Sequence, residues 1–172
     1  EGQILYDEKT LKKMNLDRYR NTDIGIVFQS YNLLPRLTAI ENIMVSMEIS
    51  KVKVKNKKQK ALELMKSVGL SEEHAKRKIL KLSGGEQQRI AIARSLAYNP
   101  KIIIADEPTG NLDPKNSRDI MKLLTEINKK GTTVVVVTHD KEMVNLMKKR
   151  VITMRKGVIV SDEQNAGYDH EN

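Results

Sequence analysis

The chain has 172 residues, with 31 lysine and arginine against 22 aspartate and glutamate residues, so its formal net charge is +9 at pH 7. This length suffices for one domain with a hydrophobic core. The chain contains no cysteine, which excludes disulfide frameworks, cysteine-ligated zinc, iron–sulfur clusters and thiol catalysis. No apolar run is long enough to span a bilayer, and no secretory signal is visible, so we expect a cytoplasmic location.

The positive charge suits either nucleic acid or an anionic membrane, and composition does not choose between them. With one phenylalanine, five tyrosines and no tryptophan, few side chains are available to stack on single-stranded bases. Many lysines gather in the stretch KVKVKNKKQK at residues 51–60. We interpret this stretch as a solvated loop that leads into a helix, with a phospholipid or nucleic-acid contact as the alternative.

The first predicted elements are two strands. Gln3–Tyr6 predicts a short strand, and the start at Glu1 without methionine indicates a fragment of a longer protein. Ile24–Phe28 is a compact apolar run rich in β-branched residues, which predicts a buried strand ending at Gln29.

A helical region is predicted between Thr38 and Pro100. Apolar residues recur at helix spacing over 40–47 and again over 61–68, where Gly69 is placed to end the second helix. A third helix is predicted from about Glu86 to Tyr98, and Pro100 prevents it from continuing.

The next segment predicts a β-α-β unit: a strand at Ile102–Ala105, a helix, and a strand at Thr133–Thr138. Asp113 is placed as the N-cap of the helix, Pro114 as its first residue and Gly131 just beyond its end. Both strands are apolar throughout, so we expect a parallel sheet covered on both faces. A helix at Lys141–Lys149, a hairpin over 151–160 and a flexible tail over 161–172 complete the chain.

Polar side chains follow three of the predicted strands. Gln29 follows the first, Asp106 and Glu107 the second, and His139 the third. Functional side chains gather at the carboxyl ends of parallel strands, where one acid can hold Mg²⁺ while its neighbour orients an attacking water. Taken alone, the acidic pair could equally be a turn with helix-capping acids, and His139 a hydrogen-bonded loop residue.

The segment Leu82–Arg89 reads LSGGEQQR. A Ser-Gly-Gly turn that opens a helix leaves backbone N–H groups unpaired and lets a phosphate approach closely. The alternative is an ordinary serine-capped helix with glycines in a tight turn.

Together these motifs resemble the ATP-binding subunits of ABC transporters. LSGGEQQRIAIARSL at 82–96 is similar to the family signature, and IIIADEPTGNLDP at 102–114 to its Walker B and D-loop segment. The resemblance implies ATP and Mg²⁺ as ligands, Glu107 and His139 as catalytic residues, and Asp106 with Gln29 at the metal. It further implies ATP contacts by Gln29, Ser83, Gly84, Gly85, Glu86 and Asp113. In the head-to-tail dimer that the family forms, Ser83 and Gly85 would act in trans.

The wording FQSYNLLPRLTAIENI at 28–43 resembles a subgroup that serves lipoprotein release, macrolide or peptide export and cell-division permeases. By that resemblance, the residues after Gln29 contact an integral membrane permease on the inner face of the cell membrane. The predicted contact residues are Tyr31, Leu33, Leu34 and Pro35, although core packing explains the two leucines equally well.

A P-loop ATPase also needs G-x-x-x-x-G-K-S/T, and none of the nine glycines is followed by lysine. The implied fold is therefore α/β, a P-loop NTPase-like and mostly parallel sheet flanked by helices, with a helical subdomain insert and without the P-loop strand and helix. The expected parts are 1–29 and 99–160 as ATPase core, 30–98 as helical subdomain and 161–172 as tail. We expect such a fragment not to hydrolyse ATP alone.

Two other functions compete with that of a transporter ATPase. A non-catalytic, shortened paralogue would lend its signature turn to a complete partner or occupy a permease. A DNA-repair-type ATPase of the same family would place a long coiled coil between Gln29 and Ser83, but only 54 positions separate them and no heptads recur. We therefore expect a second nucleotide-binding subunit and a permease as partners, and no nucleic acid.

Overall fold

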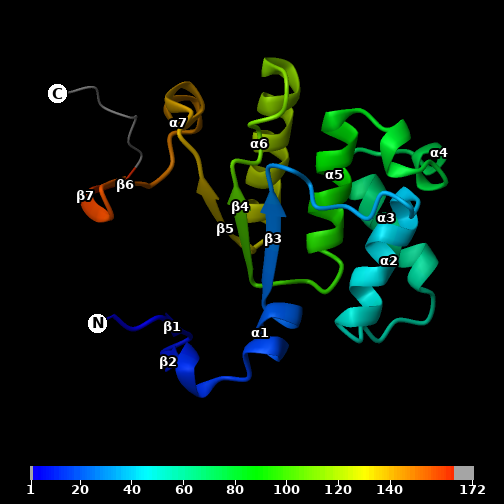
Figure 1. Ribbon diagram of the computed structural model, residues 1–172, viewed down its shortest axis with the longest axis horizontal. Coiled ribbons are helices and arrows are strands. Elements are labelled where there is room, and N and C mark those ends of the chain that lie inside the picture. Colours follow the sequence, from blue (N-terminus) through cyan, green and yellow to red (C-terminus); the bar gives the residue numbers. More distant parts are fainter. Residues whose placement is uncertain (1, 165–172) are drawn as a thin grey trace. The chain divides into compact units, whose positions relative to one another are not determined.

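The computed structural model describes residues 2–164, and the chain forms two compact units, Glu1–Val137 and Thr138–Asn172. Figure 1 shows the elements of each unit in chain order. The first unit contains β1 (Leu5–Tyr6), β2 (Lys9–Thr10), a 3-10 turn (Leu11–Lys13), α1 (Leu16–Thr22), β3 (Ile24–Phe28), α2 (Ala39–Ile49), α3 (Lys57–Ser67), α4 (Glu72–Ala75), a 3-10 turn (Ile79–Lys81), α5 (Gly84–Ser95), β4 (Ile102–Asp106), α6 (Pro114–Lys129) and β5 (Thr133–Val137).

The centre of the first unit is a parallel sheet with the strand order β3-β4-β5. The register pairs Ile24 with Ile102 and Phe28 with Asp106, and it pairs Asp106 with Val137. All three strands therefore end at one edge, and the predicted β-α-β unit and the predicted strand Ile24–Phe28 are confirmed. Asp113 caps α6 and Pro114 opens it, as the sequence predicts.

One face of this sheet is buried under helices. Val27, Ile103 and Ala105 lie on it and are fully buried. A Cβ at Gly25 would lie 3.1 Å from both Cβ and O of Ser95, so the missing side chain lets the end of α5 approach β3 closely. Packing thus favours glycine at this strand position.

The opposite face is more open than the sequence predicts. Ile26, Val135 and Val137 expose 41%, 46% and 52% of their surface within the part of the chain that the structure describes. The expectation of a sheet covered on both faces is therefore wrong for residues 2–164. An apolar strand shows that both of its faces can be buried, but it does not show which segment buries them.

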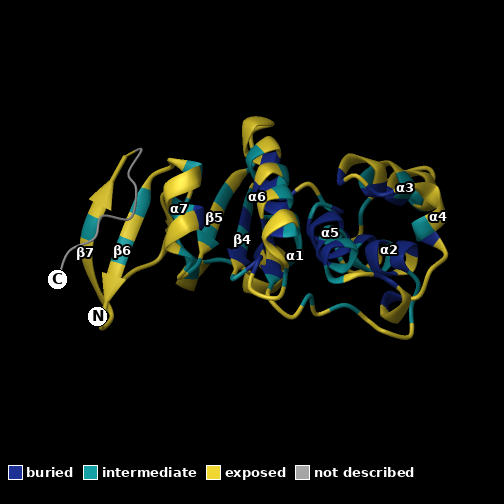
Figure 2. Cartoon of the chain, turned by 90° about the horizontal axis from the view of Figure 1, so that it is seen from above, coloured by how far each residue is buried: buried dark blue, intermediate teal, exposed yellow. Residues whose placement is uncertain are grey.

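The helical part follows β3, as predicted. Thr38 and Glu41 form a capping box at the start of α2, and Gly69, with φ of +81°, follows the end of α3. Figure 2 shows buried residues concentrated in α2 and α5. The third predicted helix begins at Gly84 and not at Glu86, because Ser83 and Glu86 cap it and the glycines occupy its first turn.

The second unit contains α7 (Lys141–Met147) and a hairpin of β6 (Val151–Arg155) with β7 (Val158–Glu163). Lys156 and Gly157 form its turn with φ of 48° and 79°, which confirms the predicted hairpin. The predicted tail over 161–172 is wrong for residues 161–163, which belong to β7 and pair with β6. The remainder from residue 165 lies outside the described residues.

Helices in residues 2–164 are all too short or too polar to cross a lipid bilayer.

Replacing an isoleucine by alanine is expected to lower the free energy of unfolding by different amounts on the two faces of the sheet. Ile103→Ala removes a fully buried side chain and is expected to lower the free energy of unfolding by about 2–5 kcal/mol. Ile26→Ala, on the open face, is expected to cost about 1 kcal/mol or less because its side chain already meets solvent. Urea unfolding measures both. Equal losses would show that the open face is buried in solution.

Candidate functional site

Three predicted site residues lie at the carboxyl edge of the sheet. Phe28 and Asp106 are register partners, so Gln29 and Glu107 each follow one member of an aligned pair on neighbouring strands. The Glu107 backbone N–H donates to Val137 O at 2.9 Å, which ties the turn after β4 to the end of β5. The sequence predicted that an amide, two carboxylates and the imidazole of His139 share one edge, and the structure confirms this for the amide and the two carboxylates.

Glu107 has an unusual backbone conformation, with φ of +43°. A non-glycine residue in this region costs on the order of 1 kcal/mol, and such residues concentrate at functional sites. Its carbonyl accepts from Gly110 N–H at 3.1 Å, which closes the turn that holds it. Because the turn is fixed at both ends, Glu107 is held beside the strand edge on a rigid backbone.

Gln29 is held by Asn111, a residue for which no role was predicted. Its Nε2 donates to Asn111 Oδ1 at 3.3 Å, and Asn111 Nδ2 donates back to Gln29 O at 3.1 Å. A Cβ on Gly110 would lie 2.5 Å from Gln29 Nε2, so a side chain there would displace the amide from its present position across the turn. The position of Asn111 inside the motif TGNLD was the available signal.

The Ser83–Glu86 turn is a reciprocal cap. Ser83 Oγ accepts from Glu86 N at 3.3 Å, while Glu86 Oε2 accepts from Ser83 N at 2.7 Å and from Ser83 Oγ at 3.0 Å. The other carboxylate oxygen lies 3.0 Å from His74 Nε2. Burial would raise the pKa of Glu86, but the hydrogen bonds from Ser83 and His74 outweigh it and lower that pKa below 4.5.

The two glycines of this turn pack against Tyr31 and against the segment that follows Glu107. A Cβ on Gly84 would lie 2.8 Å from Tyr31 Oη and 3.3 Å from Leu112 Cδ2, and one on Gly85 would lie 2.6 Å from Asn116 Oδ1. Their lack of side chains therefore has a packing reason, besides the phosphate approach that the sequence suggested. Asp113 accepts from the N–H groups of Lys115 and Asn116, each at 3.0 Å, at the start of α6.

His139 lies in the second unit, two residues beyond the end of β5. The structure does not relate its side chain to the edge formed by the first unit, so its catalytic role stays a prediction. Within residues 2–164, no three histidine, aspartate or glutamate side chains gather to form a metal site of their own.

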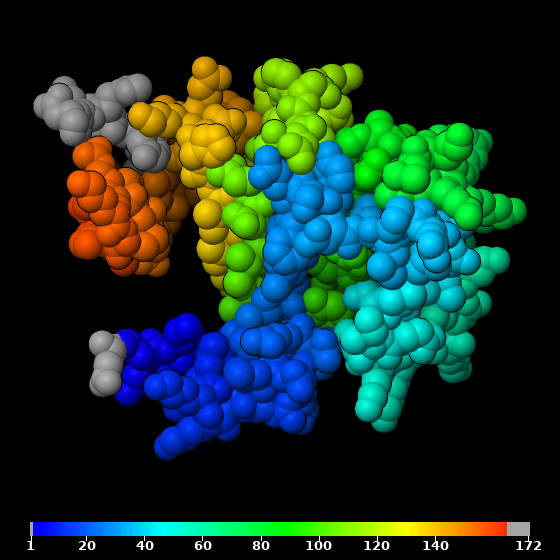
Figure 3. Space-filling view, in the orientation of Figure 1, coloured from blue at the N-terminus to red at the C-terminus, as the bar shows by residue number. Residues whose placement is uncertain are grey.

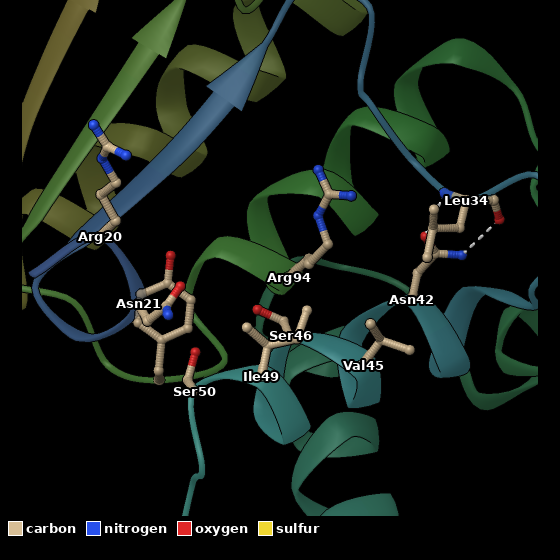
Figure 4. A pocket seen from close by; sticks show the side chains of 10 residues that line it. Arg20, Asn21, Leu34, Asn42, Val45, Ser46, Ile49, Ser50 and Arg94 are labelled. Atoms are coloured by element: carbon tan, nitrogen blue, oxygen red, sulfur yellow. Dashed lines mark hydrogen bonds between the residues drawn. The ribbon is translucent and has the colours of Figure 1, made fainter. Parts of the chain in front are cut away.

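One of the four predicted permease-contact residues, Leu34, borders a pocket of about 340 Å³ in the first unit. Leu34 lines it together with Arg20 of α1, Asn42 and Ile49 of α2, and Arg94 of α5, all shown in Figure 4. In Figure 3 the green chain around the end of α5 is visible between blue α1 and cyan α2.

Hydrogen bonds fix the loop beside this pocket. Asn42, which is buried, donates to Leu34 O at 3.1 Å and accepts from Leu34 N at 2.8 Å. Arg94 donates to the carbonyls of Tyr31 and Asn32, two residues with φ of 61° and 48°. Of the predicted contacts, Leu34 and Pro35 are exposed, Leu33 is half-buried, and Tyr31 turns its hydroxyl toward Gly84.

The parallel sheet, the acidic strand end and the capped Ser-Gly-Gly helix define an α/β domain with the layout that the family resemblance implies. The sequence pattern of the ABC transporter family matches residues 1–110. The cell division ATP-binding protein FtsE of Bacillus subtilis is 48% identical over 98% of this chain and 74% of its own length. The chain therefore belongs to the ABC transporter family.

Two solved structures agree with this assignment. The dimeric ATP-binding cassette MJ0796, in a post-hydrolysis state bound to ADP and Pi, superposes with a TM-score of 0.83 at 39% identity and covers 98% of this chain and 75% of its own. CbiO1 from Clostridium perfringens, part of the ABC transporter complex CbiONQ, has a TM-score of 0.84 at 30% identity and covers 96% and 66%. The α/β fold implied by the family resemblance is confirmed.

The lowered pKa of Glu86 predicts a pH dependence of stability. Folding lowers the pKa of the Glu86 carboxyl below its ordinary value of 4.5, so the ionised cap stabilises the fold fully above about pH 4.5. This stabilisation is lost as the pH falls through the pKa of the folded state. The difference in urea midpoint between the wild type and Glu86→Gln should therefore shrink between pH 6 and pH 3. The exposed Glu63→Gln serves as the control for loss of one charge. A difference that grows on acidification would contradict this assignment.

Proposed function

We propose that the chain is the ATP-binding and ATP-hydrolysing subunit of an ABC transporter. The observation that carries the proposal is the alignment of Gln29, Asp106 and Glu107 at one sheet edge, within a family of ATP hydrolases. The similarity to MJ0796, a dimer bound to ADP and Pi, supports ATP as substrate and a second copy as partner.

The residues at the edge suit a magnesium nucleotide. Mg²⁺ is commonly held by one or two carboxylates together with substrate phosphates and waters, and Asp106 with Gln29 would supply the protein's share. The ion would neutralise charge on the transferred phosphoryl group. Glu107, on its strained and fixed backbone, would accept a proton from the attacking water and hold it in line.

The remaining residues would act across a head-to-tail dimer. Ser83, Gly84, Gly85 and Glu86 open α5, whose first-turn N–H groups and dipole favour an anion. In the proposal these groups and Asp113 face the nucleotide bound to the partner copy. His139 contacts the γ-phosphate of the nucleotide bound to its own copy of the chain. Closure of the dimer on ATP and reopening after hydrolysis would drive the membrane partner.

We place the permease contact at the pocket bordered by Leu34, on the inner face of the cell membrane. Arg20 and Arg94 line this pocket beside apolar Ile49, which suits an amphipathic helix with an acidic residue. CbiO1 is part of a transporter complex, which supports a membrane partner. The sequence suggested one subgroup, of the lipoprotein-release and macrolide-export kind, which also includes cell-division permeases. The similarity to FtsE supports a cell-division permease as the partner and gives no specific support to lipoprotein release or macrolide export.

The 172 residues contain no G-x-x-x-x-G-K-S/T motif, so ATP turnover is tested after a phosphate-loop segment is supplied ahead of Glu1. In that protein Glu107→Gln is expected to lower turnover by about 100-fold or more and to trap an ATP-loaded dimer, which gel filtration detects. Glu63→Gln should leave turnover unchanged.

Normal turnover by Glu107→Gln would refute its role as general base. The second candidate function is the non-catalytic module, in which the capped turn at the start of α5 serves a complete partner cassette. It predicts turnover only when the unmodified chain is mixed with a separate complete cassette, with no effect of Glu107→Gln in this chain.

A further inference from the structure

Gln88 lies in the middle of α5 and is fully buried. Its helical neighbours on the same face, Ala91, Ile92 and Ser95, are buried as well. A side-chain amide on such a face loses its contacts with water, so its presence requires a partner in the protein.

That partner is a pair of backbone carbonyls from two different strand ends. Gln88 Nε2 donates to Pro108 O at 2.6 Å and to Phe28 O at 3.4 Å. Pro108 directly follows Glu107, and Phe28 directly precedes Gln29. One nitrogen atom thus bridges the backbone beside both edge residues to the helix that begins at the Ser83 cap.

The oxygen atom of this amide, unlike its nitrogen, has no hydrogen-bond partner in the part of the chain that the structure describes. Gln88 Oε1 is the one buried side-chain oxygen or nitrogen without a hydrogen-bond partner among residues 2–164. An unsatisfied buried acceptor is unfavourable, and it persists where the rest of the group is held in place by other contacts. The two hydrogen bonds from Nε2 therefore hold the amide in an orientation that leaves Oε1 without a donor from the described residues.

We propose that Gln88 is a positioning residue that holds Gln29 and Glu107 at a fixed distance from the signature turn. Movement of α5, when Ser83–Gly85 meet a partner's nucleotide, would pass through this amide to both strand ends. The role in turnover rests on the proposed ATPase function, but the mechanical linkage does not.

Gln87 provides a matched control. It is the same residue type one position earlier on α5, it is half-buried, and its Nε2 donates to Leu82 O at 2.9 Å, next to its own helix cap. Gln87→Met and Gln88→Met make the same chemical change, but only the second breaks the link to the sheet.

The first test measures amide hydrogen exchange by NMR in the 172-residue chain. Gln88→Met is expected to speed exchange of the Glu107 and Gly110 N–H groups by about 10-fold, because their turn loses an anchor. Leu124 in α6 is the internal reference for global stability and should change by less than about 2-fold, and Gln87→Met should leave all three unchanged. Equal acceleration at Leu124, or equal effects of the two variants, would overturn the proposal.

Wild-type protein supplies a second readout that does not depend on a variant folding. The Gln88 side-chain NH₂ should exchange slowly, whereas the side-chain NH₂ of Gln59, near the exposed start of α3, should exchange rapidly. Rapid exchange at Gln88 would overturn the linkage.

In the protein supplied with a phosphate loop, Gln88→Met is expected to lower kcat for ATP by about 10-fold with KM changed less than 2-fold, because misplaced catalytic groups weaken the transition state more than binding. An unchanged kcat would overturn the catalytic part of the proposal. If the wild type itself turns over no ATP, the proposed function fails, while the exchange measurements still decide the linkage.

Discussion

The parallel register of β3 and β4 is the constraint on which the rest of the site depends. It pairs Phe28 with Asp106 and thereby brings Gln29 and Glu107 to one edge, although 78 positions separate them in the sequence. A register shift of one residue would move the side chains of a strand to the opposite face. Close approach of α5, which Gly25 permits, and the bond from Glu107 N–H to Val137 O hold this arrangement.

Helix α5 connects the parts of the first unit that the proposed function needs. Its first turn carries the Ser83–Glu86 cap, Gln88 reaches both strand ends, and Arg94 holds the loop that leads to Leu34. Contacts at either end of the helix therefore act on the same rigid element. In the proposed function, a nucleotide at the start of α5 and a membrane partner near its end would therefore both act on one continuous helix of 12 residues.

Local patterns predicted most of the elements. Asp113, Pro114 and Gly131 marked the ends of α6, and β-branched runs marked the strands, because caps and strand preference depend on residues close in sequence. Beyond the common edge that parallel strands share, side-chain contacts between distant segments could not be predicted. The packing of Gly85 on Asn116, the bonds of Asn111 to Gln29 and the reach of Gln88 each join positions far apart, and the open sheet face reflects what covers a strand and not its own composition.

The strand register is the most direct test of the account. A NOESY spectrum of the isotope-labelled chain should show contacts that pair Phe28 with Asp106 and Asp106 with Val137. These pairings would establish that the amide and the two carboxylates share one edge. Contacts displaced by one residue, or strands paired in another order, would contradict the account, because the groups assigned to one nucleotide would then point away from one another.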